Sequence, residues 1–144
     1  MERLKSKYPV VLSQDLVWSD MDAFQHINNR VYLRYFEDVR MAYFEKIKVM
    51  DHKNKTQFGP ILAAINCNFR APLSYPDRIQ VATTVEELER RRFKMSYVVY
   101  SEKLEKVAAE GDGLIVYYDY ENQKSCPIPD AIRASINALQ KGFE

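Results

Sequence analysis

The sequence predicts an α+β domain in which one long helix lies across one face of a curled antiparallel sheet. Three observations predict it: one long stretch with helical spacing, four later segments with period-two alternation, and one short helical pattern near the C-terminus. With a single long helix, packing it across the sheet is the economical way to bury both apolar faces. The 144 residues suffice for one ordinary core. We therefore expect residues 1–144 to form a single domain with about five strands.

The composition indicates a substantial hydrophobic core and almost no net charge. The chain is 47% hydrophobic with 10 Tyr and 7 Phe, and 21 basic against 20 acidic residues leave a net charge of +1. No overall charge therefore steers it toward nucleic acid or an anionic membrane, and no run approaches the roughly 18 apolar residues of a spanning helix. The start MERLKSKYPV lacks the apolar segment of a leader, so we expect a cytoplasmic protein. Cys67 and Cys126 have no CxxC partner, which favours core packing.

The N-terminal third predicts a strand, a polar loop and the long helix. Residues 12–18 alternate between two faces and fit a first strand. After Asn28 and Asn29, either of which can cap a helix, apolar residues recur at steps of three or four. They are Tyr32, Phe36, Val39, Tyr43 and Ile47, with Val31 and Tyr35 widening the stripe. This widening indicates a helix that is packed on more than one side.

The rest of the chain predicts four strands and a short helix. Residues 50–60, MDHKNKTQFGP, have the composition of an exposed loop that ends at Gly59-Pro60. Alternation then predicts strands over residues 61–70, 79–85, 93–99 and 107–118. Gly111 and Gly113 lie inside the last run, where a strand bends or another backbone comes close. Pro129 opens a helix with a narrow apolar stripe of Ile132, Ile136 and Leu139.

One segment combines residue types that are suited to catalysis. Asp22 and His26 stand just before the predicted helix start, where free N–H groups and the helix dipole favour a developing negative charge. A carboxylate, an imidazole and an anion-stabilising helix end are the components of an acyl-transfer or hydrolysis site. The plainer alternative is that Asp20 and Asp22 form turns and that His26 only holds the loop.

The pattern D-x-D-x₃-H-x-N-N-x₂-Y-x₂-Y-x-E-x₂-R closely resembles the hot-dog-fold acyl-CoA thioesterases of the 4-hydroxybenzoyl-CoA thioesterase family. The same run resembles the D-x-N-x-H-x-N-N segment of plant acyl-carrier-protein thioesterases. NCNFRAPLSYPDRIQV and VYYDYENQKSCPIPDAIR follow in the family order, so the resemblance covers nearly the whole chain. It implies a hot-dog fold and hydrolysis of an acyl thioester to a carboxylic acid and a thiol.

The resemblance also implies roles for individual residues. Asp22 would be the nucleophile or the base that activates water, and backbone N–H groups at Asn28 and Asn29 would polarise the thioester carbonyl. His26 would orient water, share a proton with Asp22, or fix the loop. Gln25 stands where many bacterial members have Gly and could supply an amide, whereas Phe24 stands where the plant-type enzymes have a further catalytic Asn.

Two further predictions concern the substrate. Tyr32 is a core residue or a wall of the acyl tunnel. Arg91 and Arg92 belong either to a solvated turn or to a loose site for the phosphates of coenzyme A, which guanidinium groups bind well.

The resemblance implies an acyl-CoA or acyl-carrier-protein substrate and a homodimer or homotetramer with its site at the subunit boundary. We expect no metal, redox cofactor or ATP, because hydrolysis needs none and no motif for them is present. Two alternatives stay open: an acyl-thioester hydratase or dehydratase on the same fold, and a non-catalytic module that binds acyl-CoA. Asp22→Asn and a panel of acyl-CoA substrates would separate them.

Overall fold

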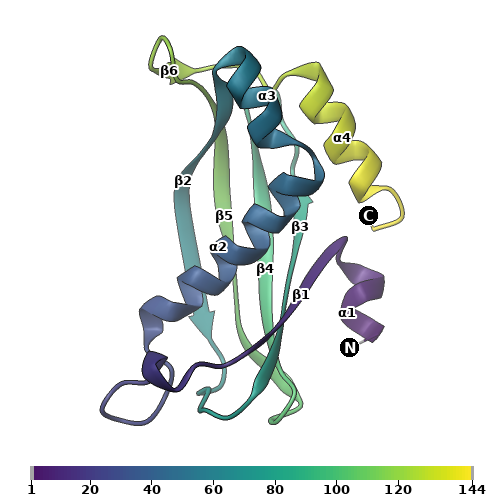
Figure 1. The fold of residues 1–144 in the computed structure, drawn as a ribbon. Coiled ribbons are helices and arrows are strands. Elements are labelled where there is room, and N and C mark those ends of the chain that lie inside the picture. The colour runs from purple at the N-terminus through teal and green to yellow at the C-terminus, as the bar shows by residue number, and fades with distance from the viewer. Residues whose placement is uncertain (1, 144) are drawn as a thin grey trace.

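The computed structural model describes residues 2–143. Figure 1 shows a long helix crossing a sheet, with the C-terminal helix beside it. In chain order the elements are α1 (Glu2–Lys7), β1 (Val10–Asp15), a 3-10 turn (Trp18–Asp20), α2 (Asn29–Lys46), α3 (Val49–Thr56), β2 (Phe58–Phe69), β3 (Arg78–Glu86), β4 (Arg92–Ser101), β5 (Lys106–Asp119), β6 (Lys124–Ser125) and α4 (Asp130–Gln140).

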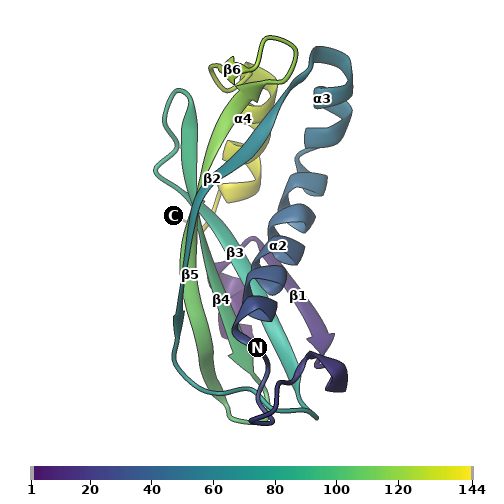
Figure 2. The same ribbon diagram turned by 90° about the vertical axis from the view of Figure 1, so that its left-hand side faces the viewer.

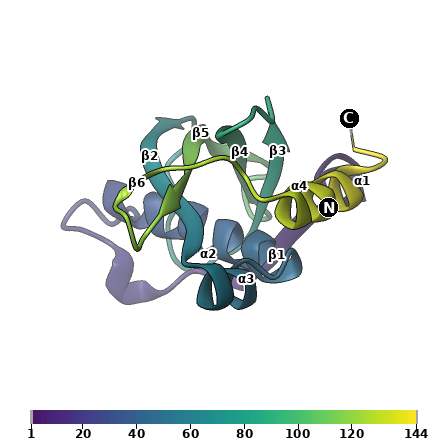
Figure 3. The ribbon, with the colours of Figure 1, turned by 90° about the horizontal axis from the view of Figure 1, so that it is seen from above.

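The sheet is antiparallel and curls around α2. Its strand order is β1-β3-β4-β5-β2, and the two-residue strand β6 pairs with β5. Figure 2 shows α2 and α3 together as a layer on one side of the sheet, and Figure 3 shows the sheet curving over them. The α+β class is thus confirmed, and the arrangement is that of the hot-dog fold.

Helix α2 begins and packs as its sequence predicts. Asn28 has extended backbone angles, and its Oδ1 accepts a hydrogen bond of 3.1 Å from the backbone N–H of Arg30, which makes it the N-cap. The five residues of the apolar stripe are at most 2% exposed, and Val31 and Tyr35 are buried as well. The helix is therefore enclosed on more than one side, between the inner face of the sheet and its flanking segments.

The C-terminal helix is fixed to the core by Gln140, which is only 8% exposed. Its Oε1 accepts hydrogen bonds from Tyr43 Oη (2.8 Å) and from the backbone N–H of Val85 (3.0 Å), and its Nε2 donates to Thr84 Oγ1 (2.8 Å). One amide thus ties α4 to both α2 and β3.

The first strand is shifted from its predicted position. It spans Val10–Asp15 rather than residues 12–18, and Trp18, at 69% exposure, lies in the 3-10 turn. The reason is the length of its neighbour, because the β1–β3 ladder ends where Asp15 pairs with Arg78, the first residue of β3. Beyond that pair the chain has no strand to join, although the alternating pattern continues.

The prediction of a loop over residues 50–60 is wrong. Val49–Thr56 form α3, and β2 already begins at Phe58. Lys48 and Gln57, both with left-handed backbone angles, separate α3 from its neighbours. In α3 only Val49 is buried, so its sequence lacks the apolar periodicity that marks a helix. Pro60 fits inside β2 because β2 is an edge strand of the sheet.

Two other elements were not predicted from the sequence, namely the short helix α1 and the strand β6. The expectation for Gly111 is confirmed, because a Cβ there would lie 2.1 Å from the carbonyl oxygen of Asn66 on β2. The same β2–β5 ladder has a register shift farther along, between Leu62 and Ala64. Among residues 2–143, no helix is both long and apolar enough to cross a membrane.

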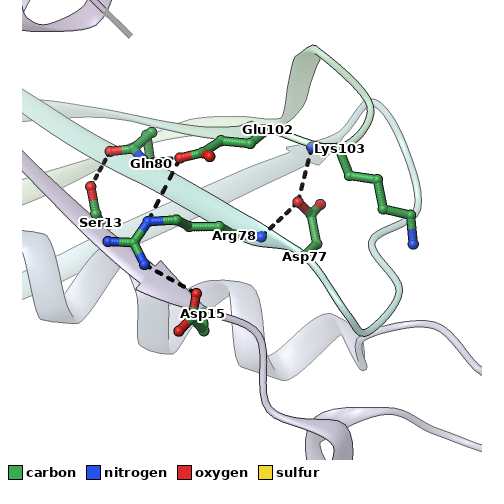
Figure 4. A network of polar contacts seen from close by, with 7 residues as sticks. All are labelled: Ser13, Asp15, Asp77, Arg78, Gln80, Glu102 and Lys103. Carbon is green, nitrogen blue, oxygen red and sulfur yellow. Dashed lines mark hydrogen bonds and ion pairs between the residues drawn. The ribbon is translucent and has the colours of Figure 1, made fainter.

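A polar network holds the corner where β1, β3 and β4 meet (Figure 4). Asp77 Oδ1 accepts the backbone N–H groups of Arg78 (2.7 Å) and Lys103 (3.0 Å). The Arg78 guanidinium lies 3.2 Å from Asp15 and 3.8 Å from Glu102. The network fixes the end of the segment 70–77, and that segment contacts the loop that contains Asp22.

Candidate active site

Asp22 and His26 lie opposite one another across the neck of a tight loop. The backbone N–H of Asp22 donates to the carbonyl oxygen of His26 at 3.0 Å, and an isolated bridge pairs Met21 with Ile27. The N–H of Gln25 closes the turn by donating to the Asp22 carbonyl oxygen at 2.9 Å. Backbone hydrogen bonds alone therefore bring the two predicted catalytic residues together.

The loop is anchored to the segment that precedes β3. Ile27 N–H donates to Leu73 O at 2.8 Å, and Ser74 Oγ donates to Gln25 O at 2.9 Å. Gln25 itself has a φ of 62°, in the left-handed region that favours Gly. A Gly at this position would adopt this backbone conformation without strain. The Gln25 side chain is exposed and is not part of the cavity wall.

The two aspartates of the D-x-D pair have different surroundings. Asp20 forms an ion pair with Arg34, whose Nη1 lies 3.3 Å from Asp20 Oδ1 and whose pKa is raised by this hydrogen-bonded carboxylate. Asp22 is exposed, accepts the backbone N–H of Phe24 at 2.9 Å, and has no ion-pair partner among residues 4–143, whose side chains the structure describes. Asp20 therefore serves the structure of the loop, and the Asp22 carboxylate faces solvent.

A cavity of about 420 Å³ opens beside this loop. It joins the loop, the first turn of α2 and the end of β2, and its wall includes Asp22, His26, Asn29, Tyr32, Phe69 and Arg70. Four of the residues singled out from the sequence, Asp22, His26, Asn29 and Tyr32, thus line one cavity. Asn28 lies beside it as the helix cap.

One backbone N–H group at the start of α2 belongs to a residue that lines this cavity and has no partner among the described residues. The N–H of Arg30 is bonded to the Asn28 side chain, and that of Val31 donates to the Asn28 carbonyl oxygen at 3.0 Å. Within the described residues, the N–H of Asn29 has no hydrogen-bond partner. Such a group at a helix N-terminus can stabilise a developing negative charge.

Tyr32 is both a core residue and part of the cavity wall. It is 2% exposed and packs edge-to-face against Phe69, with 5.0 Å between ring centroids. Burial raises the pKa of its phenol above the ordinary value, so the group is neutral at physiological pH. Its ring therefore offers an apolar surface next to the Asp22 loop.

Arg91 and Arg92 lie at the other end of the sheet within the same chain. Arg92 pairs with Val116 near the β6 end of β5, whereas Phe69 at the cavity pairs with Ala109 at the opposite end. Arg91 Nη1 donates to the carbonyl oxygen of Ser125 at 3.2 Å, and Arg92 Nε lies 3.2 Å from Glu89. The structure does not bring these arginines into the Asp22 cavity of their own chain.

Phe69 and Arg70 are among the residues of the cavity wall that sequence reasoning missed. Arg70 is exposed and lies 3.0 Å from Glu110 in an ion pair. Both residues stand at the end of the strand that the alternation predicts, but nothing in one sequence shows that this end lies beside the Asp22 loop. Phe24, which was noted only as a departure from the plant-type pattern, also lines the cavity and is 82% exposed.

The curled antiparallel sheet around a long helix is the hot-dog fold, and the match to a thioesterase family identifies this chain as a thioester hydrolase. The model of the thioesterase-like superfamily matches residues 16–136, and the chain belongs to that family.

Characterised and solved relatives agree with this assignment. The chain is 23% identical over 121 residues to the long-chain acyl-CoA thioesterase FadM of Escherichia coli, covering 84% of this chain and 92% of that protein. A putative esterase of Aquifex aeolicus is 27% identical, with 86% and 94% covered. The structure is similar to a Thermus thermophilus thioesterase complexed with coenzyme A and Zn, with a TM-score of 0.82, 28% identity, and 94% and 96% covered.

Proposed function

We propose that the protein hydrolyses an acyl-CoA to a free carboxylic acid and coenzyme A, with Asp22 as the reacting carboxylate. The observation that carries this proposal is the cavity in which Asp22, His26 and the first turn of α2 meet. Two relatives support the choice of acyl-CoA: FadM is named a long-chain acyl-CoA thioesterase, and the Thermus thioesterase was solved with coenzyme A.

In the proposed reaction the thioester carbonyl carbon lies next to the Asp22 carboxylate. Asp22 either removes a proton from water, whose oxygen then attacks this carbon, or attacks it directly to form an anhydride that water opens. In both routes the C–S bond breaks, the acyl group leaves as the acid, and the thiolate of coenzyme A takes up a proton. Both need the same carboxylate in the same place.

The carbonyl oxygen acquires negative charge as the bond to carbon forms. We assign its stabilisation to the backbone N–H of Asn29, because the other N–H groups of the first turn are bonded to Asn28. Asn28 then acts indirectly, by fixing the turn that orients this N–H group. Of the two asparagines, only Asn29 would contact the substrate.

His26 is assigned a role in orienting water or sharing the proton with Asp22. Its backbone carbonyl accepts a hydrogen bond from the N–H of Asp22, and this bond holds the backbones of the two residues next to each other. Its imidazole is exposed in the cavity wall. An imidazole in this place can accept or donate a proton at either ring nitrogen.

We further propose a homodimer formed through the edge strand β2. This twelve-residue strand ends the sheet, and four consecutive residues, Ile61, Leu62, Ala63 and Ala64, are exposed. A long uncharged edge of this kind favours pairing with another strand. In a symmetric dimer the two copies of β2 run antiparallel, so the Phe69 end of one lies beside the Phe58 end of the other.

Such a dimer gives Arg91 and Arg92 a function. The end of the sheet that carries them would approach the Asp22 cavity of the partner subunit, where the phosphates of coenzyme A would lie. Arg91→Gln with Arg92→Gln should raise KM for acyl-CoA with little change in kcat. The KM for an acyl-pantetheine, which lacks the nucleotide phosphates, should not change in this double variant.

The central experiment measures thiol release from short, long and aryl acyl-CoAs by the wild type and Asp22→Asn. Asp51→Asn is the matched control, because Asp51 is an exposed carboxylate on α3 outside this cavity. The proposal predicts release by the wild type and Asp51→Asn and its loss in Asp22→Asn. Release that survives in Asp22→Asn would remove Asp22 from the mechanism.

Two other outcomes would point to the alternative functions. Hydration of an enoyl-CoA without thiol release would identify a hydratase. Binding of acyl-CoA without turnover of any substrate would identify a binding module.

A further inference from the structure

A second cavity, of about 370 Å³, lies at the far end of α2 from Asp22. It lies between the last turns of α2, α3, the first half of β2 and the end of β5, and it is open to solvent on one side. Most of its wall is apolar, with side chains of Phe44, Val49, Leu62 and Ile115. Arg40 and Lys53 also line it, and no Asp or Glu is among the described residues of its wall. It is thus an apolar cavity with two cations and no acid.

Arg40 is the unusual residue of this cavity, since its side chain is only 8% exposed. Its Nη1 donates to Tyr97 Oη at 3.1 Å, and the guanidinium lies over the Tyr97 ring. The nearest carboxylate, Glu37, is 4.0 Å from Nη2, and the Glu37 side chain is 62% exposed. Among residues 4–143, whose side chains the structure describes, this group with five N–H donors has one neutral acceptor and one loose ion pair.

A buried guanidinium is costly to desolvate unless an anion or several acceptors satisfy it. A carboxylate would do so best, because its two oxygens match the fork of N–H donors. Lys53 stands on the more exposed side of the cavity, with Nζ 5.2 Å from the centroid of the Tyr120 ring. Its charge adds to the attraction for an anion entering from solvent.

The groove between α2 and β2 continues from this cavity toward the Asp22 site as a second hollow. This hollow adjoins the cavity, shares Arg40 and Leu62 with it, and is otherwise lined by Leu33, Arg34, Glu37 and Ile65. Farther toward the start of α2 and the end of β2 lie Tyr32 and Phe69, in the wall of the Asp22 cavity. From Asn29 to Phe44 the helix axis advances about 22 Å, comparable to a long acyl chain.

We propose that this cavity binds the end of an apolar chain that carries a carboxylate, with Arg40 as the residue that pairs with it. The proposal deepens the function above and rests on it in one respect, namely that an acyl chain enters the groove from the Asp22 site. The ligand is either the distal carboxylate of an ω-carboxyacyl-CoA substrate or a free long-chain carboxylic acid, which is the class of product that hydrolysis releases.

Calorimetric titration with dodecanoate tests the cavity without thioester chemistry. We expect saturable binding by the wild type, and at least about tenfold weaker binding by Arg40→Met. Arg40→Lys, which keeps the positive charge, should lose less affinity for dodecanoate than Arg40→Met. Lys46→Met removes a cation from the exposed side of the same helix and should bind like the wild type. Dodecan-1-ol, which lacks the carboxylate, should bind equally weakly to the wild type and Arg40→Met.

If Arg40→Met does not fold, Met50→Trp provides a second test. Met50 lines the cavity from its solvent side and is 54% exposed, so a larger side chain there narrows the cavity without entering the core. Dodecanoate binding should fall in this variant too. Equal binding of dodecanoate and dodecan-1-ol to the wild type, or unchanged dodecanoate binding in a folded Arg40→Met or Met50→Trp variant, would overturn the proposal.

The source of the carboxylate is distinguished by kinetics. If the ligand is part of the substrate, Arg40→Met should lower kcat/KM for dodecanedioyl-CoA about tenfold more than for dodecanoyl-CoA. If the ligand is a free acid, the two substrates should be affected equally while dodecanoate binding is lost. Asp22→Asn should keep dodecanoate binding, so a wrong assignment of Asp22 would leave the result for the cavity intact.

Discussion

The backbone N–H of Phe24 donates a hydrogen bond of 2.9 Å to Oδ1 of Asp22. This bond holds one carboxylate oxygen toward the loop and leaves the other without a hydrogen bond in the described part of the chain. In Asp22→Asn the amide oxygen can accept the same bond, so the loop should keep its shape. Because the charge is lost, kcat/KM should fall roughly 10²- to 10⁴-fold.

The measurement is thiol release in the presence of a disulfide reagent, with thermal unfolding to establish that the variant is folded. A loss smaller than tenfold would show that Asp22 is not the reacting group.

Asn28 is expected to contribute to stability and activity through the same hydrogen bond. Asn28→Ala removes the cap from the Arg30 N–H and should destabilise the protein by about 1 kcal/mol. It should also lower kcat, because the Asn29 N–H loses its fixed orientation. Asn28→Asp can still cap and should recover most of the stability. Urea unfolding and steady-state kinetics measure the two effects, and equal activity of Asn28→Ala and wild type would contradict the assignment.

Gln140 should be one of the most sensitive positions outside the site. Gln140→Leu leaves the Val85 N–H and the Tyr43 hydroxyl without their partner in a buried place. We expect a loss of about 2–4 kcal/mol in the free energy of unfolding. Asn137→Leu, at an exposed position of the same helix, is the control and should change stability by less than about 0.5 kcal/mol. Chemical denaturation of both variants measures the difference.

Asp119 should make part of the stability dependent on acid pH. Its pKa in the folded chain is lowered from the ordinary value of 3.8, first by the hydrogen bond from the Asn122 side chain and then by backbone N–H groups of the same turn. As the pH falls, the unfolded chain takes up the proton first. The stabilisation is therefore complete above about pH 5 and is lost as the pH falls through the ordinary pKa and then the folded one.

Asp119→Asn should consequently melt at a lower temperature than the wild type at pH 7, and the difference should shrink toward pH 2. Thermal unfolding followed by circular dichroism at several pH values measures this. A difference in Tm that stays constant across this range would contradict the role given to the charge.

The β2 edge should determine the oligomeric state. Ile61→Lys combined with Ala64→Lys places two charges on this strand and should shift sedimentation from dimer to monomer. Thiol release should fall as the dimer dissociates, because we expect the active site to need the partner subunit. Leu104→Lys is the control, since Leu104 is 38% exposed and Ile61 is 40% exposed. A wild-type protein that sediments as a monomer would remove the proposed interface.

Local patterns in the sequence were enough for the main elements. The spacing of Tyr32, Phe36 and Tyr43 predicted α2, and Asn28 caps it as its residue type favours. The alternation predicted β2 to β5, and Gly111 marked a close approach of two backbones. The wrong predictions concern elements that a neighbouring element determines. β1 ends where its partner strand β3 begins, and α3 buries too little surface for its sequence to show a helical pattern.

The sequence by itself determined the fold class and the resemblance to thioesterases, because hydrophobic periodicity and the spacing of a local motif are properties of neighbouring residues. Only the tertiary structure decided that Phe69 and Arg70 line the Asp22 cavity and that Arg91 and Arg92 lie at the opposite end of the sheet. Only the tertiary structure, too, shows that Arg40 is buried in the wall of an apolar cavity that no described Asp or Glu lines. These relationships depend on which strand ends meet which helix ends, and that pairing joins residues far apart along the chain.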